Sequence, residues 1–198
     1  MSKRVFDWVM SSLGLLVLAP LLLLIALAVK LDSPGPVFFR QERVGRFGQT
    51  FRIHKFRTMR HEPVGQGLQI TVGADSRITR VGGFLRGSKL DELPQLIDVW
   101  VGSMSLVGPR PEVPRYVAHY PAALRDKILS VRPGITDIAS IEYRDESAVL
   151  ARAADPEQAY IHEVMPHKLA LAASYVDQAS VWTDIKLILR TIRAIVRA

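Results

Sequence analysis

The chain contains no cysteine, and several other catalytic patterns are missing as well. Without cysteine there is no disulfide, no thiolate metal site and no cysteine nucleophile, which is compatible with the reducing cytoplasmic side of a cell. No serine lies in a nucleophile elbow, so a serine hydrolase is disfavoured. The histidines lack metal-ligand spacing, which disfavours a zinc site. They are His54, His61, His119, His162 and His167.

Nucleotide-binding and nucleic-acid-binding signatures are also missing. The glycine-rich stretch from Gly65 to Gly73 does not have the spacing of a P-loop or a dinucleotide fingerprint. No helix-turn-helix, zinc finger or RNA-binding aromatic motif is evident. The sequence therefore gives no support to a nucleotide fold of either type, and nucleic acid is not an expected partner.

Acidic side chains are fewer than basic ones, since 19 Asp and Glu stand against 26 Lys and Arg in 198 residues. This excess attracts phosphates, whether on nucleic acid, anionic lipid or a small substrate, and does not choose among them. Hydrophobic residues make up 48% of the chain, which is high for a soluble protein and low for a polytopic one. We expect one polar domain attached to a single membrane segment.

An apolar run near the N-terminus is the candidate membrane segment. No charged side chain occurs from Trp8 to Val29, and this length is enough to reach across a hydrocarbon core. The run leads directly into Lys30 and the Pro34-Gly35-Pro36 segment, without the small residues of a signal-peptide cleavage site, so we expect it to be retained. The predicted division is a membrane helix over residues 1–32 and a catalytic domain over residues 33–198.

Two features of this segment favour a re-entrant helix over the usual straight span. Pro20 lies near the middle, where it removes a backbone hydrogen bond and favours a kink. Basic residues flank both ends, with Lys3 and Arg4 before the run and Lys30 after it, and the positive-inside rule places both ends on the cytoplasmic face. A helix kinked at Pro20 that enters and leaves by the same face satisfies both observations and predicts a monotopic membrane protein.

The C-terminal segment is a second candidate membrane contact. An apolar stripe recurs there at helical spacing beside a basic stripe, and the two consist of Trp182, Ile185, Leu189, Ile192 and Val196, and of Lys186, Arg190, Arg193 and Arg197. Such a helix suits an anionic membrane surface. The alternative is an ordinary helix that packs its apolar stripe on the core, and the sequence favours neither.

The segment between these two helices predicts an irregular α+β fold, mostly α with a small β hairpin. Val37–Phe39 and Thr50–Ile53 are expected to be strands on either side of a turn at Gly45–Gly48. Helices are expected over 78–85, 93–101, 114–120, 122–130 and 166–175, separated by proline-rich joints.

Asp91 and Glu92 are the first candidate catalytic residues. They precede Leu93-Pro94, and proline is acceptable in a first helical turn, so the pair is expected to start a helix. One interpretation is structural, because Ser88 to Asp91 matches a capping box. The other is functional, because helix starts bind phosphate and Arg86 and Lys89 lie just upstream.

Two further cationic elements are candidates for phosphate contacts. Arg110 lies between two prolines that restrict its backbone, which reduces the entropy its guanidinium loses on binding an oxyanion. A rigid surface turn is the alternative. Lys55 and Arg57 are expected to share one face of a strand and to offer a second cationic element, although most such pairs are solvated surface.

In combination these segments resemble the bacterial sugar transferase family of small monotopic phosphoglycosyl transferases, over nearly the whole chain. The resemblance is carried by ordered motifs, of which Asp-Glu-Leu-Pro-Gln and Gly-Pro-Arg-Pro are the most specific. The motifs are Lys3-Arg4-Val5-Phe6-Asp7, Pro34-Gly35-Pro36-Val37-Phe38-Phe39-Arg40-Gln41, Phe56-Arg57-Thr58-Met59, Leu90-Asp91-Glu92-Leu93-Pro94-Gln95-Leu96, Val107-Gly108-Pro109-Arg110-Pro111 and Val131-Arg132-Pro133-Gly134-Ile135-Thr136.

The resemblance implies a two-step reaction. Asp91 attacks the sugar-linked phosphorus of a UDP-sugar, UMP leaves, and polyprenyl (undecaprenyl) phosphate then takes the sugar phosphate from Asp91. By the family pattern Asp91 also binds Mg²⁺, and Glu92 positions the dyad or handles a proton. Lys55, Arg86 and Arg110 match phosphate-contacting positions, and Arg144 aligns with an arginine associated with nucleotide or sugar recognition.

The resemblance also implies a setting and partners. The family acts at the cytoplasmic face of the bacterial inner membrane, in the first membrane step of polysaccharide or glycan assembly, so membrane lipid is an expected partner and a homodimer is compatible with it. Two departures limit the transfer. Many members have Ser-Pro at the kink where this chain has Ala19-Pro20, and the residues after Thr136 differ up to Arg144, which leaves the sugar undetermined.

Two alternatives are not enzymes. One is a membrane-tethered basic module that binds anionic lipid or nucleic acid without catalysis, although a polyanion would be repelled by Asp91 and Glu92. The other is a single-pass protein with a structural cytoplasmic domain, which leaves the cations around Asp91 unexplained.

Overall fold

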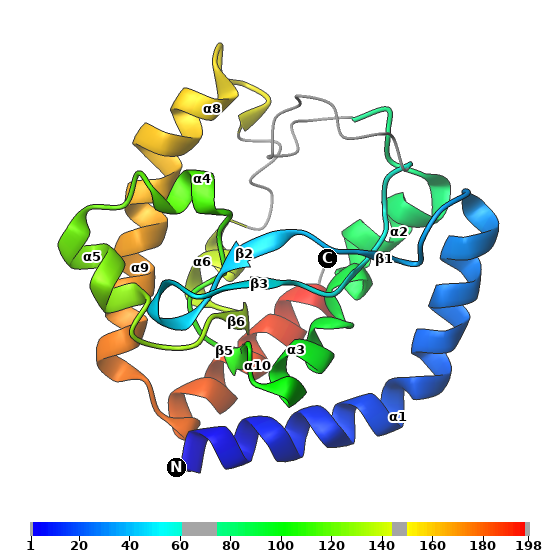
Figure 1. Ribbon diagram of the computed structural model, residues 1–198, viewed down its shortest axis with the longest axis horizontal. Helices are drawn as coiled ribbons and strands as arrows, with labels where there is room; N and C mark the ends of the chain where they lie inside the picture. The colour runs from blue at the N-terminus through cyan, green and yellow to red at the C-terminus, as the bar shows by residue number, and fades with distance from the viewer. Residues whose placement is uncertain (1, 61–74, 144–149, 197–198) are drawn as a thin grey trace.

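The computed structural model describes residues 2–60, 75–143 and 150–196 (Figure 1). The glycine-rich stretch Gly65–Gly73, His61 and Arg144 lie outside these ranges. The described part is mostly helical with one long apolar N-terminal helix, as the sequence predicted, and it contains three small sheets where a single β hairpin was expected. The helices are α1 (Ser2–Asp32), α2 (Arg80–Ser88), α3 (Gln95–Val101), α4 (Pro114–Val117), α5 (Ala122–Ile128), α6 (Ile138–Glu142), α8 (Pro156–Ala159), α9 (Met165–Gln178) and α10 (Val181–Val196).

The strands are short, and they form three two-stranded sheets. They are β1 (Phe38–Phe39), β2 (Glu42–Val44), β3 (Thr50–Arg52), β4 (Lys55–Phe56), β5 (Ser105–Val107) and β6 (Gly134–Thr136). The predicted hairpin is present as β2 and β3 around a 3₁₀ turn at Arg46–Gly48. One predicted pairing is wrong. Strand β1, which was expected to pair with Thr50–Ile53, pairs with β4 instead, with Phe38 opposite Phe56.

The parallel pair β5 and β6 was not predicted from the sequence. It brings Gly108 and Gly134 into close backbone contact, since a Cβ at Gly134 would lie 2.0 Å from the Gly108 nitrogen. Parallel strands need a long crossover. Here the crossover carries Arg110 and helices α4 and α5, so this pair fixes where Arg110 enters the interior.

α1 exposes most of its apolar side chains, as expected of a helix that lies in an apolar medium. Only 11% of its most apolar 18-residue window is buried, whereas a core helix of a soluble protein would be mostly buried. Leu16 is 75% exposed and Leu31 is 78% exposed. The helix ends at Asp32, just before Pro34-Gly35-Pro36, as expected. The division at residues 32 and 33 into two domains stays a prediction.

Both ends of α1 contact the rest of the chain. At its start Lys3 pairs with the carboxylate of Asp184, which is fully buried, and Asp7 accepts a hydrogen bond from the Leu106 amide at 3.1 Å. At its end Asp32 accepts from the Val81 amide at 3.1 Å. In Figure 1 the ribbon of α1 changes direction along its course, between an N-terminal part near α10 and a C-terminal part near α2.

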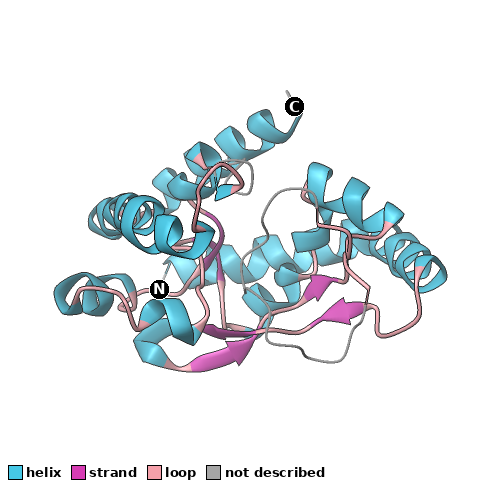
Figure 2. Cartoon of the chain, turned by 90° about the horizontal axis from the view of Figure 1, so that it is seen from above, coloured by secondary structure: helices cyan, strands magenta, loops and turns pink. Residues whose placement is uncertain are grey.

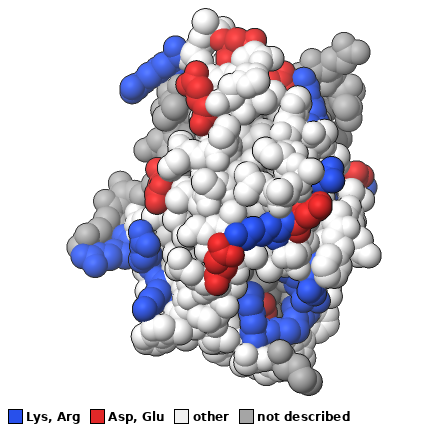
Figure 3. All heavy atoms as spheres, turned by 90° about the vertical axis from the view of Figure 1, so that its left-hand side faces the viewer, with Lys and Arg blue, Asp and Glu red and all other residues white. Residues whose placement is uncertain are grey.

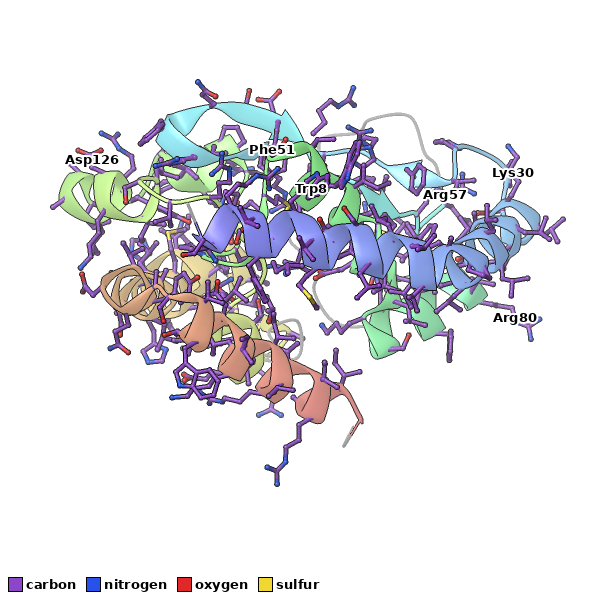
Figure 4. The ribbon with its side chains drawn as sticks, turned by 90° about the horizontal axis from the view of Figure 1, so that it is seen from below. Trp8, Lys30, Phe51, Arg57, Arg80 and Asp126 are labelled. Carbon is purple, nitrogen blue, oxygen red and sulfur yellow. The ribbon has the colours of Figure 1, made fainter. Side chains whose placement is uncertain are left out.

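The side chain of Arg57 also binds to the end of α1, and this contact contradicts one prediction from the sequence. The Arg57 guanidinium is buried and donates to the carbonyl oxygens of Val29 at 3.2 Å and Ser33 at 2.6 Å. Figure 4 shows Arg57 beside the end of α1 that carries Lys30, while Trp8 lies on its other half. The hypothesis that Arg57 forms a phosphate-binding pair with Lys55 is therefore wrong, because its charge caps the membrane helix.

α10 places its predicted apolar stripe on the outside. Trp182, Leu189 and Ile192 are 65%, 61% and 53% exposed, whereas Asp184 and Leu187 face inward and are nearly fully buried. The inward face packs on β5, where Leu187 joins Val107 and Tyr175 in a cluster. The alternative in which this stripe packs on the core is therefore wrong.

α1 connects the two sides of the molecule. Seen from above, α9 lies on one side and α2 with the last turns of α1 lies on the other (Figure 2), whereas the start of α1 contacts α10 through the pair Lys3 and Asp184. The side of the molecule that carries α5 and α9 shows acidic and basic side chains interspersed among uncharged ones (Figure 3). The α1 surface is different in kind, because its exposed side chains are almost all apolar.

Candidate active site

Asp91 and Glu92 occupy a tight turn between two helices. α2 ends at Ser88, and Lys89 then adopts a left-handed conformation with φ of 59°, which redirects the chain into the 3₁₀ turn Leu90–Glu92. The capping-box interpretation is wrong, because the Ser88 hydroxyl donates back to the Phe84 carbonyl at 2.8 Å and caps nothing downstream. The acids are thus not explained by a cap.

Asp91 is buried, with 1% of the residue exposed, yet it lines a pocket. Its Oδ2 lies 2.9 Å from the Lys55 ammonium nitrogen. Its Oδ1 is buried and has no hydrogen-bond partner among the described residues. A buried carboxylate oxygen without a donor costs free energy, so structures keep such an atom where it has a function. Oδ1 is therefore the oxygen of this carboxylate whose capacity to accept a hydrogen bond or bind a ligand is unused by the described residues.

Glu92 is held from two directions. Arg110 donates to Oε2 at 3.2 Å and to Oε1 at 2.5 Å, and Lys55 donates to Oε1 at 3.1 Å. Burial disfavours the charge of Glu92, but the attraction of Arg110 and Lys55 and their hydrogen bonds outweigh it and hold the pKa of Glu92 well below its usual range. Glu92 therefore carries a carboxylate that holds two cations, Lys55 and Arg110.

Arg110 is the most firmly charged group of the site. The pKa of Arg110 is raised, because attraction to Glu92 exceeds the opposing effect of burial. Its backbone amide donates to Asp137 at 3.2 Å, which ties the motif to the residues after β6. The side chain is 35% exposed, so one side of the guanidinium remains open to the pocket.

Arg86 and Lys89 line the same pocket on the α2 side. The Arg86 Nε donates to the Thr58 hydroxyl at 2.8 Å. Burial lowers the pKa of Arg86, while attraction to Asp91 opposes this effect. Burial also lowers the pKa of Lys89. Both side chains line the pocket. An anionic ligand bound there would raise their pKa values and so offset the effect of burial.

The pocket has a volume of about 630 Å³ and runs from the α2 side to α6, α9 and α10. It brings together five of the six site residues expected from the sequence, namely Lys55, Arg86, Asp91, Glu92 and Arg110. A separate hollow of about 700 Å³ lies between the β2–β3 hairpin and α5. It contains the exposed pair Arg125 and Asp126 and no grouping of acids and cations like that around Asp91.

The sequence reasoning missed a third carboxylate in this pocket, that of the largely buried Glu112. Glu112 Oε1 accepts a hydrogen bond from the Tyr160 hydroxyl and lies 3.6 Å from the Lys168 ammonium, and Oε2 lies 3.7 Å from Arg43. Only its position directly after Gly-Pro-Arg-Pro was a local signal. Its partners come from residues 43, 160 and 168, so no local pattern predicts the cluster.

A metal site made entirely of protein ligands is not present in the described ranges, because no group of three or more His, Asp and Glu side chains converges there. Mg²⁺ commonly binds through one or two carboxylates together with substrate phosphates and water. The free Oδ1 of Asp91 fits that arrangement.

Comparisons with known proteins point in one direction. The sequence model described as bacterial sugar transferase matches residues 1–198. A UDP-glucose:undecaprenyl-phosphate glucose-1-phosphate transferase of Caulobacter vibrioides is 40% identical over 193 residues, which cover 96% of this chain and 68% of the relative.

Other relatives are longer than this chain and differ in the sugar of their names. A protein of Escherichia coli with the same name as the Caulobacter relative is 40% identical over 96% of this chain and 39% of its own length. A UDP-N-acetylgalactosamine-undecaprenyl-phosphate N-acetylgalactosaminephosphotransferase of Aeromonas hydrophila is 36% identical over 98% of this chain and 43% of its own. The chain thus spans about two fifths of the length of these two relatives.

Proposed function

Because this chain belongs to the bacterial sugar transferase family, we propose that it transfers a sugar 1-phosphate from a UDP-sugar to polyprenyl (undecaprenyl) phosphate with release of UMP. The observation that carries the proposal is the Asp91 carboxylate. One of its oxygens is held by Lys55, and the other is buried at the wall of a cationic pocket with no hydrogen-bond donor from the described parts of the chain. This is the arrangement expected of an oriented anionic nucleophile.

The reaction has two balanced displacements at one phosphorus. In the first, Asp91 Oδ1 forms a bond to the sugar-linked phosphorus, and the bond from that phosphorus to the oxygen of the UMP leaving group breaks. In the second, a phosphate oxygen of the polyprenyl phosphate attacks the same phosphorus and the bond to Asp91 breaks. The products are UMP and polyprenyl diphosphate sugar, and Asp91 is regenerated.

The cations make this attack of one anion on another possible. Lys55 orients Asp91 and reduces its repulsion of the diphosphate, while Arg110 and Arg86 line the space that the phosphates would occupy. Glu92 holds Lys55 and Arg110 in place through three hydrogen bonds. Its role in this proposal is to position these two cations, and no proton transfer is assigned to it.

Mg²⁺ is the expected cofactor, and Asp91 is the residue that would hold it together with the diphosphate. When bound it neutralises charge on the phosphates. Arg144, the remaining candidate for sugar or nucleotide recognition, lies outside the described residues and stays a prediction, as does a homodimer.

We propose further that α1 is a re-entrant, monotopic anchor. Its first turns are fixed to the domain by Lys3 and Asp7, and its last turn is fixed to the same domain by Asp32. A straight span would place these two ends on opposite sides of a membrane, so the contacts favour entry and exit by one face. The changed direction of the ribbon in Figure 1 and the presence of Pro20 inside the helix agree with this.

The basic residues that flank the apolar run favour one side of the membrane for both ends of α1. Lys3 and Arg4 precede the apolar run and Lys30 follows it, which favours the cytoplasmic face of the bacterial inner membrane for both ends. The exposed Trp182, Leu189 and Ile192 of α10, beside a basic stripe, would then lie in the membrane interface. The pocket would open between a soluble donor and a lipid acceptor.

The test is release of UMP from a panel of UDP-sugars in the presence of undecaprenyl phosphate and Mg²⁺. We expect one or a few sugars to support turnover and Asp91→Asn to reduce it at least a hundredfold, because the amide is nearly isosteric but is not an anionic nucleophile. A protein that keeps more than a few per cent of activity after Asp91→Asn, with deamidation excluded, would remove Asp91 from the mechanism.

The same assay separates the enzyme from a basic module that only binds lipid or nucleic acid. Such a module would release no UMP from any donor, and its affinity for polyanions would fall steeply with salt. The carboxylates of Asp91 and Glu92 beside Lys55 and Arg110 disfavour this alternative, because they would repel a polyanion.

A further inference from the structure

Glu112 lines the Asp91 pocket but has no part in the reaction proposed above. Its side chain is 12% exposed and is held by the Tyr160 hydroxyl, by Lys168 and by Arg43. These three partners come from β2, from the turn before α9 and from α9 itself. Groups from two segments far apart in the chain, β2 and the continuous helical stretch over residues 160–178, therefore converge on one carboxylate at the wall of the pocket.

One oxygen of Glu112 remains available as an acceptor. Oε1 accepts from Tyr160, whereas Oε2 accepts no hydrogen bond from the described residues. Arg43 lies 3.7 Å from Oε2, which is too far for a hydrogen bond. An ionised carboxylate has about four acceptor sites, so this oxygen has unused capacity.

Glu112 is held in the ionised form. Burial disfavours its charge, but the attraction of Lys168 and Arg43 and the Tyr160 hydrogen bond outweigh burial and lower the pKa of Glu112. It therefore accepts hydrogen bonds and donates none. In a pocket that must hold a diphosphate, such an anion repels phosphate and suits only a ligand group that donates, such as a hydroxyl.

The position of Glu112 next to Arg110 indicates which part of a UDP-sugar would carry the hydroxyl that donates to Glu112. Pro111 separates the two residues and favours an extended backbone before it, which advances by about 3.1 Å per residue, so the two Cα atoms are about 6 Å apart. This spacing is comparable to one sugar ring. The hexose of a UDP-sugar is linked through its anomeric oxygen to the phosphorus that Asp91 would attack, whereas the ribose lies beyond the second phosphate.

We propose that Glu112 accepts a hydrogen bond from a hydroxyl of the donor's hexose and so contributes to the choice among UDP-sugars. This inference rests on the proposed function. Glu112 is a binding residue in it, and Tyr160 and Lys168 are positioning residues that orient its carboxylate.

The test is equilibrium binding of UDP-glucose, UDP-N-acetylgalactosamine and UDP to the full chain carrying Asp91→Asn, which blocks turnover. Glu112→Gln, added to this parent, is expected to weaken binding of the preferred UDP-sugar about tenfold, because a hydrogen bond to a charged group is replaced by a neutral one. Binding of UDP should change less than about twofold. The ratio of affinities for the two sugars should change as well.

Two further variants control for loss of structure. Tyr160→Phe keeps the buried ring and removes the hydroxyl, which donates to Glu112 and accepts from Lys168 at 3.3 Å, so it should weaken sugar binding in the same ligand-selective way but less. Glu157→Gln is the matched control, because Glu157 also accepts from a tyrosine hydroxyl, that of Tyr116 at 3.3 Å, and pairs with a cation, Arg115, but does not line the pocket. It should leave all three affinities unchanged.

Equal weakening of UDP and of both UDP-sugars would overturn the assignment to the hexose, because the contact would then be to the ribose, the uracil or the phosphates. Unchanged binding in both Glu112→Gln and Tyr160→Phe would overturn it as well. Failure of the proposed function is seen separately. In that case the unmodified protein releases no UMP from any UDP-sugar, and both conclusions fall together.

Discussion

A single methyl group at Gly82 should disturb the fold of α2 and the position of Arg86 together. A Cβ built at Gly82 would lie 2.1 Å from the carbonyl oxygen of Thr58, whereas real contacts of this kind are essentially never under 3.0 Å. The neighbouring atoms are backbone, so they cannot be relieved by a side-chain rotation. α2 or residue 58 must move by roughly 1 Å.

The expected cost of Gly82→Ala follows from this displacement. Overpacking of a buried site costs about 1–3 kcal/mol, and the better helix propensity of alanine offsets about 0.5–1 kcal/mol of it. Gly83→Ala is the matched control, since its Cβ would meet only the Ile78 methyl at 4.0 Å, an ordinary contact. It should stabilise the chain by about 0.5–1 kcal/mol.

The assay is thermal unfolding of the purified protein in detergent at one fixed scan rate. For a chain of this size 1 kcal/mol shifts the midpoint by about 2–4 °C, so the two variants should differ by several degrees. The Arg86 Nε donates to the Thr58 hydroxyl at 2.8 Å, so Gly82→Ala should also slow UMP release at temperatures where it is folded. Equal midpoints for Gly82→Ala and Gly83→Ala would refute the reasoning.

Three further changes test other parts of the molecule. Glu92→Gln should lower kcat for UMP release about 10- to 100-fold, because a neutral amide no longer fixes two cations, and a wild-type rate would contradict that role. Since the folded pKa of Glu92 lies below its usual value of 4.5, its contribution to stability is present above that pH and is lost as pH falls, so the variant should show a weaker loss of stability in acid. Pro20→Leu should straighten the anchor in part of the population. In the native helix, a cysteine introduced by Ser2→Cys should react with an impermeant reagent only from the cytoplasmic side. In Pro20→Leu the same cysteine should also react from the far side. Far-side labelling of the native helix would disprove the re-entrant anchor. Lys3→Met should destabilise the chain by about 2–3 kcal/mol, because it leaves buried Asp184 without its cation. Adding Asp184→Leu should recover part of this loss in the same thermal assay. No recovery would mean that the ion pair is not the cause of the loss.

The sequence by itself determined the features that depend on local pattern. The apolar run, its end before Pro34-Gly35-Pro36, the turn at Gly45–Gly48 followed by strand β3, and the amphipathic nature of α10 all follow from hydropathy and turn residues, whereas the strand that pairs with β3 was not predicted. The acid pair Asp91 and Glu92 beside basic residues and a proline was a local signal that also fitted a helix cap, and the family motifs around it singled it out as a candidate active site. Family resemblance was confirmed by the match over residues 1–198.

Other features could be read only from the tertiary structure, since they join residues far apart in the chain. Arg57 follows a strand and yet caps α1, and Ser88, which resembles a cap, bonds back into α2. The exposed stripe of α10 and a core stripe have the same periodicity, so only packing could tell them apart. Glu112 gained its candidate role from residues 43, 160 and 168. Periodicity along a chain reports which side of an element is apolar, but which charge meets which across a pocket depends on how the elements pack, and that information is not local.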